Sequence, residues 1–121
     1  MRFTDLSNLA DERTVEVAAL LARLQEELGV RGAAARELLA ITFDTAAGNI
    51  EVVMRQQPLA EDYPALAVVM GEIARTCGQD AIGAGQLRRI LFREDRVRLD
   101  VIDAGGRAQS CDYFIRAATL H

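Results

Sequence analysis

Residues 96–114 read RVRLDVIDAGGRAQSCDYF, and this stretch decides the fold. From Arg96 to Val101 charged and apolar residues alternate, which is the period of a strand with one buried and one exposed face. The glycines at 105 and 106 are typical of a tight turn, and a second run of strand-forming residues follows them. The stretch therefore predicts a β-hairpin.

The length of the turn sets which residues of this hairpin face each other. A three-residue loop over 104–106 places Leu99 opposite Cys111 on the buried face and Arg98 opposite Asp112 on the exposed face. A two-residue loop would place Leu99 opposite Asp112 and bury a carboxylate, which is unfavourable. We therefore expect the three-residue loop.

Residues 38–54 predict another hairpin. The stretch Phe43-Asp44-Thr45 disfavours a long helix over 38–56, which is the alternative interpretation. A four-residue loop over 45–48 places apolar residues opposite one another on one face. The expected facing pairs are Phe43 with Ile50, Ile41 with Val52, and Leu39 with Met54.

Two helices are expected beside the hairpins. Residues 12–28 have helical periodicity, with Asp11 as N-cap and Gly29 at the end. Its apolar stripe is Val17, Leu21, Leu24 and Leu28. A second helix is expected from Pro64 to Cys77, with Asp62 as its cap. Its bulky stripe is Leu66, Val69, Met70, Ile73 and Cys77, and its second stripe of small residues, Ala67, Gly71 and Ala74, predicts burial on both sides.

Residues 87–93 fit two interpretations. Leu87, Ile90 and Leu91 have helical spacing, and the helix is favoured over a strand that runs into Arg96.

No internal repeat or linker is evident, so residues 1–121 are expected to form a single domain. The predicted fold class is α+β, with an antiparallel sheet built from two hairpins, helices packed on one face, and the order α-ββ-α-α-ββ.

Composition excludes several classes of chemistry. The only histidine is His121, and Cys77 and Cys111 lie in no metal-binding motif. All fourteen basic residues are arginine, so lysine-dependent catalysis is excluded. We therefore expect no catalytic residues, no metal and no cofactor, and a protein that is not an enzyme.

The longest apolar run, 65–71, is far shorter than a membrane span, and residues 1–5 open no signal peptide, so we expect a cytoplasmic protein without a membrane partner.

Charge is unevenly distributed along the chain. The net charge is −4, but residues 88–121 carry seven arginines against five acidic residues. Five of these arginines form a candidate partner-binding strip, and they are Arg88, Arg89, Arg93, Arg96 and Arg98. Guanidinium groups bind carboxylate and phosphate in a bidentate manner and are enriched at interface hot spots. The alternative is a solvated surface whose arginines are balanced by nearby acidic residues.

These observations predict a small non-catalytic regulatory or adaptor protein that binds another protein. A homodimer, formed through a sheet edge or through Leu38, Ala40 and Val53, is a further hypothesis. The expected order of elements and the acidic character resemble those of small dimeric secretion chaperones; the resemblance covers organisation only.

Two other function classes are alternatives. A winged-helix nucleic-acid binder would use 70–77 and 85–93 as crossing helices and 96–116 as the wing, although the pI near 5.0 disfavours it. A small-ligand binder or carboxylate-based enzyme would use a pocket between sheet and helices. The residues for that pocket would be Asp44, Glu51, Tyr63 and Tyr113.

Overall fold

The computed structural model describes residues 2–3, 17–44 and 46–115. Its helices are α2 (Val17–Val30) and α3 (Leu66–Gln79), and single 3₁₀ turns, η1 (Ala35–Glu37) and η2 (Ala84–Gln86), each precede a strand. The strands are β1 (Arg2–Phe3), β2 (Leu38–Asp44), β3 (Asn49–Met54), β4 (Leu87–Phe92), β5 (Arg96–Ile102) and β6 (Ala108–Phe114). The order along the described chain is thus β-α-ββ-α-βββ.

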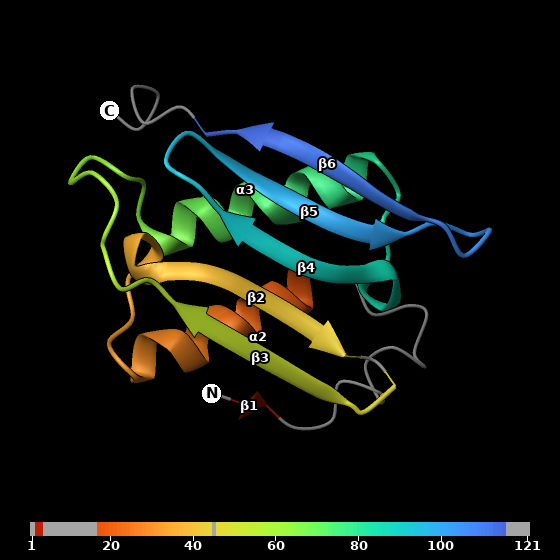
Figure 1. Ribbon diagram of the computed structural model, residues 1–121, viewed down its shortest axis with the longest axis horizontal. Helices are drawn as coiled ribbons and strands as arrows, with labels where there is room; N and C mark the ends of the chain where they lie inside the picture. Colours follow the sequence, from red (N-terminus) through yellow and green to blue (C-terminus); the bar gives the residue numbers. More distant parts are fainter. Residues whose placement is uncertain (1, 4–16, 45, 116–121) are drawn as a thin grey trace.

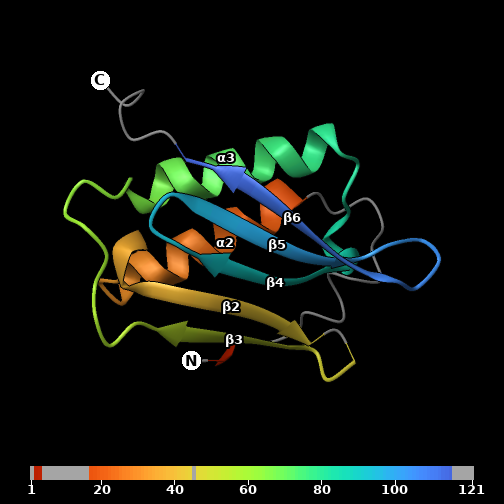
Figure 2. The same cartoon turned by 45° about the horizontal axis from the view of Figure 1, so that its top comes forward.

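The strands form one antiparallel sheet in the order β1-β3-β2-β4-β5-β6. Both helices lie against the same face of this sheet, and Figures 1 and 2 show them side by side behind the strands. The predicted α+β class, with an antiparallel sheet and helices on one face, is confirmed. The core lies between the helices and the inner face of the sheet.

The predicted stripes of both helices supply this core. All four predicted residues of α2 are buried, and so are Val69, Met70, Ile73 and Cys77 of α3. The helix ends differ from the prediction, because α2 continues past Gly29 to Val30 and the left-handed residue is Gly32, with φ of 77°. The predicted cap Asp11 lies outside the described residues.

The prediction that α3 is buried on both sides was wrong. Ala67 and Gly71 are exposed, and no atom of another element lies within 4 Å of a Cβ built on Gly71. The reason is architectural. In a two-layer structure a helix needs only one apolar stripe, and its far side faces solvent.

The registers of both predicted hairpins are confirmed, with one exception. Leu99 faces Cys111 and Arg98 faces Asp112, as the three-residue loop requires. In the first hairpin Ile41 faces Val52 and Phe43 faces Ile50, but Met54 faces Leu38 instead of Leu39. A β-bulge between Leu38 and Ala40 causes this shift and turns Leu39 out of the core.

Residues 87–92 form a strand, so the favoured helical interpretation was wrong. β4 lies in the middle of the sheet and pairs with β2 on one side and β5 on the other. Two ladders of backbone hydrogen bonds and the complete burial of Leu87, Ile90 and Phe92 outweigh the helical spacing of three apolar residues.

The structure also contains a repeat that the sequence analysis missed. From Val30 to Gln79, from Ala35 to Ala84 and from Leu38 to Leu87 the distance along the chain is each time 49 positions. The bulge at the start of β2 recurs at the start of β4, between Leu87 and Arg89. Each half is therefore a helix, a 3₁₀ turn and a bulged strand that opens a hairpin.

Backbone hydrogen bonds between helix and strand recur at the same spacing. Residue 32 donates to residue 29, residue 33 to residue 28 and residue 37 to residue 34, and the equivalents follow 49 positions later. The bonds are Gly32 N to Gly29 O (3.0 Å) and Ala81 N to Gly78 O (3.3 Å), Ala33 N to Leu28 O and Ile82 N to Cys77 O (both 2.8 Å), and Glu37 N to Ala34 O (2.9 Å) and Gln86 N to Gly83 O (3.0 Å). The two connections thus share one backbone conformation.

Ala81 and Gly32 occupy equivalent left-handed positions and provide a matched test of the repeat. Ala81 has φ of 56°, a conformation that is unfavourable for a residue with a Cβ. We expect Ala81→Gly to stabilise the protein and Gly32→Ala to destabilise it, each by about 1 kcal/mol in the free energy of unfolding. Urea denaturation of the two variants measures both changes, and equal signs would contradict the equivalence.

Ile73 tests how central α3 is to the core. It is buried among the residues between helix and sheet. We expect Ile73→Ala to lower the free energy of unfolding by about 2–5 kcal/mol, because it leaves a cavity in a packed core. Ala67→Ser, on the exposed side of the same helix, is the control and should change stability by less than about 0.5 kcal/mol.

Candidate functional site

The face of the sheet opposite the helices is the open face. No helix of the described residues covers it, and Figure 2 shows both helices on the other side.

Cross-strand pairing places Val53, Ala40, Leu91, Arg98 and Asp112 in one row across five strands. The row is apolar on β3, β2 and β4 and charged on β5 and β6.

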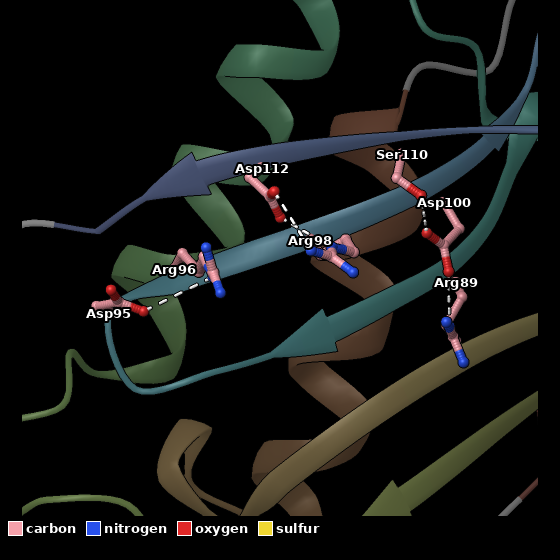
Figure 3. A network of polar contacts seen from close by, with 7 residues as sticks. All are labelled: Arg89, Asp95, Arg96, Arg98, Asp100, Ser110 and Asp112. Carbon is pink, nitrogen blue, oxygen red and sulfur yellow. Dashed lines mark hydrogen bonds and ion pairs between the residues drawn. The ribbon is translucent and has the colours of Figure 1, made fainter.

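The next row across the open face is polar. It runs from Glu51 through Thr42, Arg89 and Asp100 to Ser110. Arg89 Nε lies 2.7 Å from Asp100 Oδ2, and the Ser110 hydroxyl donates to Asp100 Oδ1 at 2.7 Å. Figure 3 shows this chain of contacts linking β4, β5 and β6. Asp100 therefore links side chains of three neighbouring strands.

A second ion pair lies beside this chain. Arg98 Nε donates to Asp112 Oδ1 at 3.0 Å, between β5 and β6 (Figure 3). The hydrogen bond from Arg98 lowers the pKa of Asp112, and the same bond raises the pKa of Arg98. Both groups are therefore charged at neutral pH, and each is partly neutralised by the other.

The other arginines of the predicted strip lie nearer the strand ends. Arg96 Nε lies 3.9 Å from Asp95 Oδ1, and Arg93 is exposed just after β4. Arg88 occupies the bulge of β4 and is half-buried. The structure thus brings Arg89 and Arg98 together on the open face, but pairs both with acidic residues of neighbouring strands. This balance of charges is the alternative that the sequence offered to a free binding strip.

An apolar patch adjoins these ion pairs, and we define it by Leu39, Val53 and Leu91. Leu39 is 37% exposed and Val53 is 36% exposed. Leu39 and Leu91 also line a hollow of about 280 Å³ together with Arg93. The bulge of β2 produces this patch because it leaves Leu39 outside the core. The sequence analysis missed the patch because it paired Leu39 with Met54.

The hypothesis of a dimer contact through Leu38, Ala40 and Val53 does not fit this arrangement. Leu38 is completely buried in the core and Ala40 is buried between its neighbours, so only Val53 is available on the surface.

Arg55 closes one side of the hollow, and no sequence signal had singled it out. Its Nη2 donates to the Phe92 carbonyl, and its backbone N–H donates to the Glu37 carbonyl at 2.7 Å. It also lines a second hollow of about 410 Å³, beside Arg36 and Pro58. Arg55 thus anchors the segment after β3 to β4 and η1.

The residues considered for a carboxylate-based enzyme are not brought together. Asp44 accepts a hydrogen bond from Ala47 N in the β2–β3 turn, and Glu51 lies exposed on the open face. Tyr63 is buried, whereas Tyr113 lies on β6 and donates to Asp80 at 2.9 Å. Neither of the two hollows is lined by any of these four residues.

The described residues also lack the features expected of a winged-helix protein, a metal site or a membrane-spanning helix. Residues 87–92 are strand, so the second crossing helix of a winged-helix arrangement is missing. Among the residues whose structure is described, no group of three or more histidine, cysteine or acidic side chains could hold a metal ion. Within the same part of the chain, no helix is long and apolar enough to span a bilayer.

The two tyrosines give a pH signature. Burial raises the pKa of Tyr63 to about 12, although the nearby Arg55 charge opposes the increase. Burial and the hydrogen bond to Asp80 also raise the pKa of Tyr113. Since the folded state favours both neutral phenols, their contribution to stability is complete below pH 10 and is lost as the pH rises towards 12 and beyond. We expect little tyrosinate absorbance in the native protein at about pH 10.5, and ionisation near pH 10 in denaturant. Coincident ionisation curves in the two states would contradict this.

No protein-family model, no curated protein and no solved structure matches this chain. Its function is therefore inferred from the side chains on the open face and from the edges of the sheet.

Proposed function

We propose that this chain is a non-catalytic adaptor or regulatory protein of the cytoplasm that binds another protein through its open face and acts as a homodimer. The observation that carries this proposal is the apolar patch (Leu39, Val53 and Leu91) bordered by the arginines of β4 and β5. A protein interface commonly combines an apolar centre with a polar rim, and arginine is enriched in it.

The ion pairs of the open face support a specific protein partner better than a polyanion. Arg89 and Arg98 are held in place by Asp100 and Asp112, so the face carries alternating charges instead of a continuous positive surface. Binding to nucleic acid depends on many cationic groups that neutralise phosphates. Alternating charges fix register and orientation against a protein with the complementary pattern.

Arg93 is the arginine of the strip best placed to reach a partner. It lines the hollow with Leu39 and Leu91 and is exposed. A partner that inserts an apolar side chain into the hollow could therefore place a carboxylate against Arg93. Such a carboxylate would add a charge-assisted hydrogen bond at the rim.

A comparative affinity purification from cytoplasmic extract tests this function. Val53→Asp and Arg93→Glu change the patch and its rim, and we expect each to reduce the recovery of a stoichiometric companion about tenfold or more, as for hot-spot residues. Val30→Asp and Arg75→Glu are the matched controls, because Val30 is 83% exposed on α2 and Arg75 is exposed on α3.

The outcome is compared after all variants are shown to be folded by circular dichroism. Loss of the companion from the open-face variants alone supports the proposal. Equal recovery from open-face and helix variants would show that the open face is not the binding surface.

A further inference from the structure

The sheet ends on one side at β6, and this edge is long. β6 has seven residues, and every one of them is paired with β5 without a bulge. Among residues 2–3, 17–44 and 46–115, no strand pairs with the other side of β6. The opposite edge of the sheet, β1, spans only two residues.

β6 lacks the features that usually protect an exposed edge. It contains no proline and no lysine, and its side chains that point to the helical side, Gln109, Cys111 and Tyr113, carry no charge. Its only charged residue, Asp112, is paired with Arg98 on the open face. Phe114 at its end is 66% exposed. The edge is therefore suited to pair with another strand.

The hairpin that presents this edge is firmly held. Asp103 Oδ1 accepts hydrogen bonds from the backbone N–H of Gly105 and Arg107, both at 2.9 Å, and Oδ2 accepts one from the Gln109 side chain at 2.7 Å. These bonds lower the pKa of Asp103, so the carboxylate stays ionised and the turn stays closed. A preformed edge loses little entropy when it pairs.

The sequence of β6 is complementary to itself in antiparallel pairing. When two copies overlap over all seven residues, Ala108 faces Phe114 and Ser110 faces Asp112 on the open face. On the helical side Gln109 faces Tyr113, and Cys111 faces Cys111 of the second copy. Apolar residues thus meet apolar residues, polar residues meet polar ones, and no like charges are opposed.

Other registers are worse. A shift that places Asp112 opposite Asp112 opposes two carboxylates and leaves Ala108 and Gln109 without partners. A shift centred on Ser110 leaves Tyr113 and Phe114 without partners. Registers shifted by one residue would bring the helical side of one copy level with the open face of the other. The reason is that successive side chains of a strand point to opposite faces.

We propose that β6 pairs antiparallel with β6 of a second copy of this chain, with Cys111 on the two-fold axis, so that two six-stranded sheets become continuous. This pairing specifies the interface of the homodimer proposed above, and it rests on that proposal. It leaves the open-face apolar patch of both copies uncovered. Strand pairing alone buries a small area, so the dimer is expected to be of micromolar affinity.

Cross-linking at Cys111 tests the position of the axis. In an antiparallel pair, facing Cβ atoms lie about 4.5–5.5 Å apart, within reach of a short bis-maleimide. Cys111 is half-exposed, whereas Cys77 is buried and its burial raises the pKa of its thiol to about 12. We expect a cross-linked dimer from the wild type and from Cys77→Ser, and none from Cys111→Ser. Cys111→Ser combined with Val30→Cys, a thiol on the helical layer, is the control and should not cross-link.

Charge at position 110 tests the register. Ser110→Asp places a carboxylate opposite Asp112 of the second copy, and Ser110→Asn is the uncharged control of the same size. We expect Ser110→Asp to weaken the dimer about tenfold or more, with partial recovery at high salt, and Ser110→Asn to leave it within about twofold of wild type. Circular dichroism of both variants verifies that the hairpin is folded, because Ser110 also bonds to Asp100.

Light scattering separates the outcomes. A monomer at about 100 µM, well above the expected micromolar Kd, would overturn both the homodimer and the β6 pairing. A dimer that does not cross-link through Cys111, or that tolerates Ser110→Asp, would overturn the β6 pairing and leave the homodimer in place. Capture of a companion by the open face is measured independently of both.

Discussion

The ladder between β2 and β4 holds the two halves of the molecule together. Ile41 and Ile90 face each other in it, both completely buried, and they are the same position of the two halves. Ala40 faces Leu91 on one side of this pair, and Thr42 faces Arg89 on the other. The pairing is therefore symmetric about Ile41 and Ile90, as for two halves related by a local two-fold axis. Without this ladder each half would be a helix beside a short ribbon of strands, which is too little to bury an apolar face.

Much of this architecture follows from local sequence. Polar turns and alternating residues determine both hairpins, because one register alone places apolar side chains opposite one another. β4 escaped prediction because Leu87, Ile90 and Leu91 fit a helix as well as a strand. The repeat would have resolved that ambiguity. Residues 35–43 and 84–92 share the pattern A-x-x-L-x-x-I-x-F, so the second segment should have the structure of the first.

The open face was predictable in composition but only partly in arrangement. The pairing of Arg98 with Asp112 follows from the predicted register of the hairpin over 96–114. The pairing of Arg89 with Asp100 could not be predicted, because residues 87–93 were interpreted as a helix and not as the strand beside β5. The apolar patch depends on the bulge of β2, and no periodicity reveals a single inserted residue. Arg55 was equally hidden, because its contact with the Phe92 carbonyl joins segments far apart in the chain.

The bulges of β2 and β4 carry Leu39 and Arg88 at the same position of the two halves. Two separate copies of one half would have to carry the same residue at both bulges. When the two halves are joined in a single polypeptide, their interiors can stay alike while the residues on their outer surfaces differ. The outer surface is therefore apolar on β3, β2 and β4 and charged on β5 and β6, so a rotation about the local two-fold axis reproduces the interior but not this surface.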